Sequence, residues 1–319
     1  MRKVKLFTHT DLDGVGCAVL AYLFYGKENV DVEYCGYNNV NDKVKEFLAN
    51  NEYMNYDTIF ITDISVSEEV ANDINNLYYI GKHKVRLFDH HATALWLNAY
   101  PWAMVAVENE ETGIKTSGTE LFYEHLRLIG YFDQCFRWNV KRFIEVVRDY
   151  DTWRWKEVLG DKGIKCKQVN DLLYIYGRDE FIEWAIERVG FGYSDFPIFN
   201  GADVMVLAQK QKDIDNYIAL KDHQLVELED KFGYKYGLLF AERYFSELGN
   251  KLCELHPELD YVAMIDIGDG KVSFRCTREG LDLGGEIAHS FGGGGHKKAA
   301  GSTFNVDLVR DLVISEVLG

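Results

Sequence analysis

The sequence predicts an α/β protein with a parallel-sheet N-terminal domain, a helical connector and a smaller α+β C-terminal domain. The chain has 319 residues, more than one domain usually holds, and 47% of them are hydrophobic, which is enough for a sizeable core. Strand-like apolar runs alternate with helix-like segments over the first ninety residues. Strand-like runs return near the C-terminus. We expect the three parts at residues 1–155, 156–232 and 233–319.

The alternation in the first ninety residues is typical of a parallel sheet with helices on both faces. The first helix closes on Gly26, and Ser67 caps the third, which has acidic residues in its first turn. The expected strands are 3–9, 30–37, 57–65 and 84–91, and the expected helices are 15–26, 40–51 and 67–78.

Polar side chains follow the first, third and fourth of these strands. Ligands of open α/β sheets bind beyond the carboxyl ends of the strands, so we expect these side chains to meet in one crevice. Carboxylates and imidazoles without thiolates suit Mn²⁺ or Mg²⁺. So many carboxylates would repel one another without cations, which favours two metals over none. The residues are His9, Asp11, Asp13, Asp63, Asp89, His90 and His91.

Each motif taken alone has an ordinary explanation. The H-x-D-x-D-G run could be a solvated loop with a helix cap, and D-H-H could be a surface turn. In KRFIEVVRDYDTWRW, Asp149 and Asp151 follow a plausible buried helix face. Either acid could complete the metal site, or both could belong to a polar turn over Trp153 and Trp155. The shared location at strand ends favours the functional interpretation.

Composition excludes several classes of protein. A net charge of -16 argues against a broad basic surface that coats long nucleic acid. No apolar stretch approaches the ~20 residues of a membrane span, so we expect no membrane partner and a cytoplasmic location. The sequence has no C-x-x-C pair, so neither a disulfide framework nor a thiolate zinc site is expected. Reduced thiols are the simplest interpretation. The six cysteines are Cys17, Cys35, Cys135, Cys166, Cys253 and Cys276.

The remaining segments predict supporting parts. The middle of the chain is helical and charged, which favours a connector over a partner-binding helix. IGDGK has the Asp-Gly signature of a tight hairpin. In FGGGGHKKAAG, glycines would let backbone N–H groups approach an anion, with His296, Lys297 and Lys298 as additional donors. The guanidinium of Arg275, a planar fork of N–H donors, would bind a phosphate or a base edge. The alternative is that Arg275 is an ordinary residue on the surface of a strand.

The motifs HTDLDGVGCA, ITDIS, LFDHHA, VVRDYDTW and FGGGGHKKAAG, in this order, resemble those of the DHH phosphoesterases with a DHH-associated C-terminal domain. They are closer to the oligoribonuclease (nano-RNase) branch than to the long RecJ-type exonucleases. The resemblance implies that residues 1–155 are the DHH catalytic domain and that residues 233–319 are the DHH-associated substrate-binding domain.

The resemblance also implies roles for single residues. Asp63 would bridge two cations, most plausibly Mn²⁺, with Mg²⁺ or Co²⁺ as alternatives. His9 lies two residues before the first aspartate, where the family more often has four. The implied ligands of the first cation are His9, Asp11 and Asp63, and those of the second are Asp13, Asp63, His90 and Asp149. The resemblance also implies catalytic roles for three residues. His91 would face the phosphate, Asp89 would orient a neighbouring histidine, and Asp151 would position water or support these two residues. Substrate would be bound by Arg275, Gly293, Gly294, Gly295, His296 and Lys297.

The activity implied by the resemblance is two-metal hydrolysis of short oligoribonucleotides, of two to about five residues, to mononucleotides. Other substrates within this chemistry are 3′-phosphoadenosine nucleotides, linear products of cyclic dinucleotides, and single-stranded DNA. Pyrophosphate is disfavoured by the glycine-rich motif. A catalytically inactive nucleotide sensor is the alternative from another class. The sequence leaves open whether the chain forms a homodimer.

Overall fold

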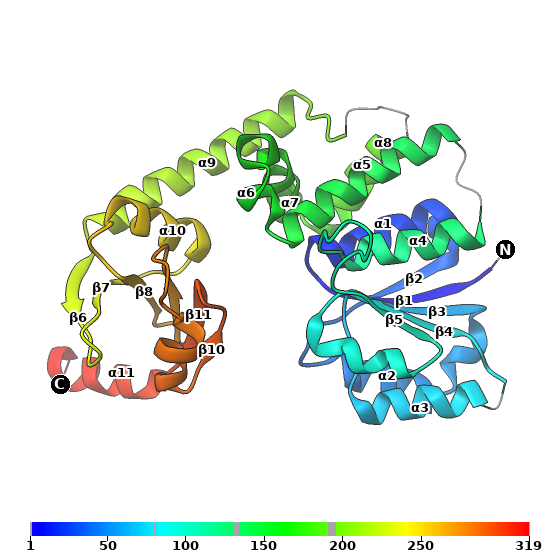
Figure 1. Ribbon diagram of the computed structural model, residues 1–319, viewed down its shortest axis with the longest axis horizontal. Coiled ribbons are helices and arrows are strands. Elements are labelled where there is room, and N and C mark those ends of the chain that lie inside the picture. The colour runs from blue at the N-terminus through cyan, green and yellow to red at the C-terminus, as the bar shows by residue number, and fades with distance from the viewer. Residues whose placement is uncertain (1, 80, 131–133, 191–195, 319) are drawn as a thin grey trace. The chain divides into compact units, whose positions relative to one another are not determined.

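The chain forms two compact units, Met1–Leu207 and Ala208–Gly319, each built on one β-sheet (Figure 1). The computed structural model describes residues 2–79, 81–130, 134–190 and 196–318. The boundary between the units lies inside the segment that the sequence predicts as a connector, and it falls within helix α9 (Gly201–Asp222). Each unit is described by itself.

The sheet of the first unit has five strands in the order β2-β1-β3-β4-β5, and every neighbouring pair is parallel. This arrangement confirms the predicted parallel sheet. The fifth strand has three residues, too few to produce a readable pattern in the sequence. The strands are β1 (Val4–Thr8), β2 (Val30–Tyr34), β3 (Thr58–Thr62), β4 (Val85–Asp89) and β5 (Ala103–Val105).

Helices cover both faces of this sheet (Figure 1). One face packs against α1 (Leu12–Tyr25) and α4 (Gly118–Ile129), and the other packs against α2 (Val40–Ala49) and α3 (Glu68–Tyr79). Successive strand residues point to opposite faces, so Phe60 joins the first cluster while Ile59 and Ile61 join the second. Burial on both faces explains why the central strand β3, TIFIT, has a continuous apolar run.

Helix α1 positions part of the site. Its Asp11 cap accepts a hydrogen bond from the backbone of Gly14, and every residue from Leu12 to Ala21 is buried. The helix ends at Gly26, whose φ of 83° is readily adopted only by glycine, as the sequence predicted. Because the helix is buried, the acidic residue in its first turn, Asp13, is buried as well.

Further helices complete the first unit on the α1 side of the sheet. The core cluster includes Val147 of α5, Leu172 of α7 and Ala185 of α8 together with residues of α1. Helices from the segment predicted as a connector therefore contribute to the core of this unit. The helices are α5 (Gln134–Asp151), α6 (Arg154–Glu157), α7 (Ile164–Tyr176) and α8 (Arg178–Gly190).

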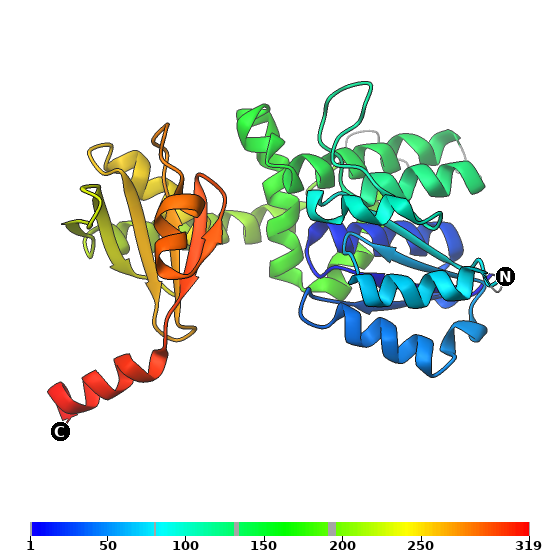
Figure 2. The same cartoon turned by 60° about the horizontal axis from the view of Figure 1, so that its bottom comes forward.

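The second unit has a mixed six-stranded sheet, in the order β10-β11-β9-β8-β7-β6 (Figure 2). Only β7 and β8 are parallel, and β8 and β9 form the hairpin predicted at IGDGK. Helix α10 (Phe245–Leu255) packs on this sheet. Helix α11 (Val306–Val313) follows the last strand, β11, in the chain. The strands are β6 (Val226–Glu229), β7 (Lys235–Phe240), β8 (Tyr261–Asp266), β9 (Lys271–Arg275), β10 (Gly294–Gly295) and β11 (Ala299–Thr303).

Two expectations from composition can be compared with this fold. In the described part of the chain, every helix is too short or too polar to cross a membrane. The five cysteines whose side chains are described, Cys17, Cys35, Cys166, Cys253 and Cys276, are buried free thiols. The side chain of Cys135 lies outside the described residues.

Candidate functional site

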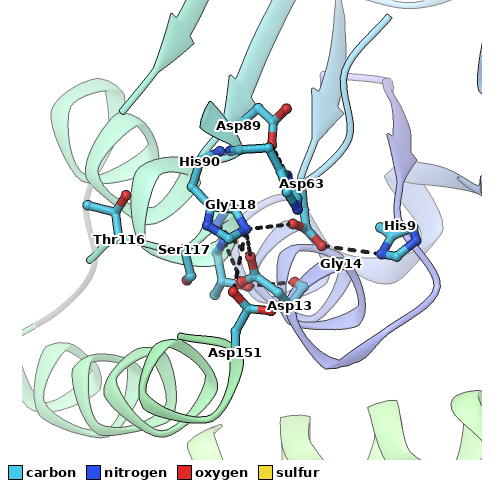
Figure 3. A network of polar contacts seen from close by, with 12 residues as sticks. His9, Asp13, Gly14, Asp63, Asp89, His90, Thr116, Ser117, Gly118 and Asp151 are labelled. Carbon is cyan, nitrogen blue, oxygen red and sulfur yellow. Dashed lines mark hydrogen bonds and ion pairs between the residues drawn. The ribbon is translucent and has the colours of Figure 1, made fainter. Parts of the chain in front are cut away.

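Side chains from five segments meet beyond the carboxyl ends of the parallel strands β1, β3 and β4 (Figure 3). The segments are the loop after β1, the start of α1, the residue after β3, the end of β4 with the two residues after it, and the end of α5. We call this set the acidic site. Its members are His9, Asp11, Asp13, Asp63, Asp89, His90, His91 and Asp151.

The acidic site contains two adjoining sets of ligand atoms that share Asp63. In the first set, His9 Nδ1 lies 2.8 Å from Asp11 Oδ2 and 3.9 Å from Asp63 Oδ2. In the second set, His90 Nε2 lies 3.3 Å from Asp63 Oδ1. Each carboxylate oxygen of Asp63 thus faces a different histidine, as a ligand shared by two cations would require.

His90 stands among three carboxylates. Besides Asp63, its Nε2 lies 3.6 Å from Asp13 Oδ2 and 3.4 Å from Asp151 Oδ2. Yet this nitrogen is buried without a hydrogen-bond partner, and so is Asp63 Oδ2. Ligand atoms about 2.1 Å from one cation, at right angles, lie about 3 Å apart. The orphaned atoms and their spacing therefore fit a cation better than a hydrogen-bonded cluster.

The charges of the acidic site lead to the same conclusion. Burial raises the pKa of Asp63 well above its usual range, and the charges of Asp13, Asp11 and Asp151 raise it further. Burial, with Asp13 and Asp11 as neighbours, raises the pKa of Asp151 to about 8. Without cations the site would take up protons, whereas divalent cations would favour the ionised carboxylates.

Asp11 differs from its neighbours. Burial alone would raise the pKa of this carboxyl group, but the hydrogen bond and charge of His9, with the backbone N–H of Gly14, lower it overall. The pair of His9 and Asp11 is therefore held together before any cation binds. Oxygen and nitrogen ligands of this kind suit Mn²⁺ or Mg²⁺.

Local backbone geometry fixes Asp63. Its φ is 56°, in the left-handed region, and its N–H donates to Phe88 O on β4 at 2.9 Å. A Cβ at Gly118 would lie 2.6 Å from Asp63 Cβ, so only glycine allows this close approach. A residue other than glycine with positive φ is uncommon and is often found at functional sites.

The N-terminus of α4 fixes Asp13. Its Oδ2 accepts a hydrogen bond from Gly118 N at 2.5 Å and its Oδ1 accepts one from Thr119 N at 2.9 Å. The free N–H groups of a helix N-terminus carry partial positive charge, which stabilises a carboxylate. This support is not apparent from the sequence, because Gly118 and Thr119 lie more than a hundred residues away from Asp13 in the chain.

Asp89 is fully buried at the end of β4 and contacts His91. Its Oδ1 lies 2.7 Å from His91 Nδ1 and accepts a hydrogen bond from His90 N at 2.8 Å. The hydrogen bond with Asp89 raises the pKa of His91. His91 Nε2 faces the hydroxyl of Tyr37 at 3.2 Å. Sequence analysis did not single out Tyr37, because an isolated tyrosine in the loop after β2 has no distinctive pattern.

The structure places Asp149 and Asp151, the two acids between which the sequence left the choice of metal ligand open, in different surroundings. Its Oδ1 accepts hydrogen bonds from Arg148 Nε at 3.1 Å and Nη2 at 2.8 Å, and Arg154 Nε lies 3.4 Å away. Asp149 belongs to none of the three clusters of candidate ligands among the described residues, whereas Asp151 lies in one with Asp13 and His90. Both acids lie in the last turn of α5, but two residues along a helix turn the side chain by about 200°. Asp151, and not Asp149, therefore lies beside the other candidate ligands.

The predicted substrate-binding residues of the second unit lie at one place in its sheet. Gly294 and Gly295 form β10 and pair with Gly301 and Ala300 of β11. Arg275, at the end of β9, is the register partner of Ala299. His296 and Lys297 are exposed in the turn between β10 and β11. We call residues 293–301 the glycine-histidine hairpin.

Two glycines of this hairpin, Gly293 and Gly295, have a structural cause. A Cβ at Gly293 would lie 2.0 Å from Gly301 O, so the neighbouring strand leaves no room for a side chain. The side chain of Arg275 is partly buried, with Nη1 donating to Phe274 O at 2.8 Å and Nη2 to Ser246 Oγ at 3.2 Å. Close strand contact therefore accounts for glycine at positions 293 and 295, whereas a side chain at position 294 would meet open space. The binding roles of the hairpin stay predictions.

No family model matches the chain. The oligoribonuclease NrnB of Bacillus subtilis strain 168 is 37% identical over 314 residues, which cover 98% of this chain and 75% of that protein.

Solved structures show a similar fold. The pGpG-specific phosphodiesterase PggH of Vibrio cholerae aligns with a TM-score of 0.53 and 17% identity, covering 99% of both chains. RecJ of Thermus thermophilus, solved in complex with Mn²⁺, aligns with a TM-score of 0.53 and 14% identity, covering 97% of this chain and 50% of RecJ.

Proposed function

Because the chain belongs to the DHH phosphoesterases, in the branch of the oligoribonuclease NrnB, we propose that it is a metal-dependent phosphodiesterase that hydrolyses short oligoribonucleotides to mononucleotides. The observation that carries this proposal is the position of His90 Nε2, buried without a hydrogen-bond partner among the carboxylates of Asp13, Asp63 and Asp151. The range of two to about five nucleotides rests on the resemblance of the motifs.

The donor set divides between two cations. We assign His9, Asp11 and Asp63 to one cation, with Mn²⁺ as the expected ion. We assign Asp13, Asp63, His90 and Asp151 to the other. When bound, two divalent cations would supply Lewis-acid polarisation of the phosphate and a water activated for attack.

His91 acts on the phosphate in this proposal. Asp89 holds Nδ1 of the imidazole, so Nε2 is the nitrogen presented to a ligand. When protonated, the ring can donate a hydrogen bond from Nε2 to a non-bridging phosphate oxygen, while Asp89 accepts the hydrogen bond from Nδ1. In the hydrolysis, the oxygen of water bonds to phosphorus and one P–O ester bond breaks. Protonated His91 would give its proton to the leaving ribose oxygen, and the proton lost by the attacking water would pass to solvent, from which His91 is protonated again.

The second unit would bind the substrate. Arg275 can present a planar fork to a phosphate or a base edge. His296 and Lys297 add exposed donors in the adjacent turn. The overall charge of -16 disfavours long polyanions, while a short substrate would need only this local group of donors.

The test is hydrolysis of a panel of RNA dinucleotides and trinucleotides by purified protein titrated with Mn²⁺, with products resolved by chromatography. The panel includes 3′-phosphoadenosine nucleotides, linear pGpG and single-stranded DNA. We expect mononucleotides from the RNA dimers. Asp63→Asn should lower kcat by more than about 10³-fold, because a shared ligand of both cations is lost.

A metal-free preparation of the wild-type protein is the matched control and should regain activity with Mn²⁺. Two outcomes would contradict the proposal. One is the absence of cleavage of every RNA dimer with Mn²⁺, and the other is unchanged hydrolysis in Asp63→Asn.

A further inference from the structure

Tyr37 is an exposed aromatic residue that borders the acidic site. Its hydroxyl lies 3.2 Å from His91 Nε2. Its ring centroid lies 5.1 Å from that of His9, tilted by 46°, and 6.1 Å from that of His91, at 90°. The ring thus contacts His9, which belongs to the first set of ligand atoms, and His91, which follows β4. Even so, 59% of the residue is exposed to solvent, so much of the ring remains uncovered.

The backbone around Tyr37 is held in place before any ligand binds. The preceding Cys35 donates from its N–H to Thr8 O of β1 at 2.8 Å. Gly36 N donates to the side chain of Asn39 at 2.9 Å, and Asn39 N donates back to Gly36 O at 3.1 Å. Tyr37 therefore sits in a closed turn between β2 and α2, which lowers the entropic cost of presenting its ring.

We propose that Tyr37 is a substrate-binding residue whose open ring face stacks on the nucleobase next to the scissile phosphate. This inference rests on the proposed function. A phosphate oxygen that bonds to His91 Nε2 comes within about 3 Å of that nitrogen, which is where the Tyr37 hydroxyl now lies. The nucleoside attached to such a phosphate is then within reach of the ring. Stacking tolerates any base, as an enzyme that degrades mixed sequences requires.

A role of the hydroxyl in holding His91 is the competing explanation. The geometry favours the ring, because Asp89 already fixes His91 through Nδ1 at 2.7 Å, and the contact of Tyr37 at 3.2 Å is longer. The two explanations make opposite predictions for Tyr37→Phe, which keeps the ring and loses the hydroxyl.

The experiment compares Tyr37→Leu and Tyr37→Phe on an RNA dinucleotide and on two analogues in which one residue, 5′ or 3′, is abasic. We expect Tyr37→Leu to raise KM for the complete dinucleotide by about 5- to 150-fold with little change in kcat. Tyr37→Phe should stay within about twofold of the wild type. With the analogue that lacks the stacked base, wild type and Tyr37→Leu should have the same KM. Tyr79→Leu is the matched control, because Tyr79 is 80% exposed at the end of α3 and lies outside the site.

Three results would overturn the inference. Tyr37→Leu could leave KM unchanged, it could raise KM equally for the complete dinucleotide and for both abasic analogues, or Tyr37→Phe could lose kcat at constant KM. The last result would assign the effect to the hydroxyl and His91. An inactive wild-type enzyme on every dinucleotide with Mn²⁺ would instead overturn the proposed function, so the two failures are distinguishable.

Discussion

The acidic site of the first unit and the glycine-histidine hairpin of the second are built in different ways. In the acidic site, Asp13, Asp63 and Asp89 are buried, and atoms of Asp63 and His90 lack hydrogen-bond partners. In the hairpin, His296 and Lys297 are exposed, and strand contact explains Gly293 and Gly295. Uncompensated burial is costly, so the first region requires a ligand to be stable in its ionised form. The second region has no such requirement.

This difference determines how strongly each region predicts function. A buried cluster with unpaired polar atoms points to a ligand by energetics alone. An exposed group of donors is compatible with a binding site and with an ordinary solvated turn. The metal centre therefore rests on geometry and motif together, while the binding role of the hairpin rests on the motif.

After the loss expected for Asp63→Asn, the largest expected effect separates Asp151 from Asp149. Asp151→Asn should lower kcat by more than about 10²-fold, since even residues that only support metal ligands contribute 10–100-fold. Asp149→Asn should keep kcat within about threefold. It should also lower the free energy of unfolding by about 1.5–3 kcal/mol, because Arg148 and Arg154 lose a buried charged partner. Steady-state kinetics and urea unfolding of both variants provide the measurements. If Asp149→Asn lost activity and Asp151→Asn kept it, the assignment from the structure would be wrong.

The outcome for these two acids shows what the sequence can predict. The motif VVRDYDTW places two carboxylates at the end of one helix, and the apolar residues around them predict the helix. Which of them faces the site depends on the rotation of α5 about its axis, and that rotation is set by packing against α1, α7 and α8. Such contacts between distant segments cannot be derived from local periodicity.

Other features followed from the sequence more directly. The order of strands and helices, the parallel sheet and the end of α1 at Gly26 agree with the structure, because apolar periodicity and glycine are strong local signals. The support of Asp13 by the start of α4, the contribution of α7 and α8 to the first core, and the position of Tyr37 beside His91 were not predictable. Each depends on residues that are far apart in the chain.

A smaller effect is expected in the second unit. Arg275→Lys keeps the charge and most of the apolar stem, but it loses the planar fork that can bind a phosphate with two hydrogen bonds. We expect KM for an RNA dinucleotide to rise by about 10-fold with kcat unchanged, and we expect His296→Ala to act in the same direction. Arg310→Lys is the control, because this arginine is 63% exposed and paired with Asp307 on α11. Equal KM values for all three variants and the wild type would remove the hairpin from the substrate site.

The smallest effect concerns stability, and it tests the acidic site without measuring activity. The pKa of Asp151 is raised to about 8 in the folded protein, compared with 3.8 for the ordinary carboxyl group. Between these values the folded state binds a proton that the unfolded state has lost, so the stability of the metal-free protein should fall as pH rises from about 4 to about 8. The raised pKa of His91 acts in the same direction above its ordinary value of 6.5.

Mn²⁺ replaces these protons, so it should raise the melting temperature more at pH 8 than at pH 5, by several degrees. Calorimetry of metal-free protein with and without Mn²⁺ across this range measures both trends. Asp151→Asn should flatten the pH dependence of the metal-free protein and reduce the gain from Mn²⁺. The glycine-histidine hairpin contains no buried carboxylate, so His296→Ala should leave both trends unchanged. If His296→Ala altered the pH dependence and the gain from Mn²⁺ as much as Asp151→Asn does, the proposed contrast between the two regions would be wrong.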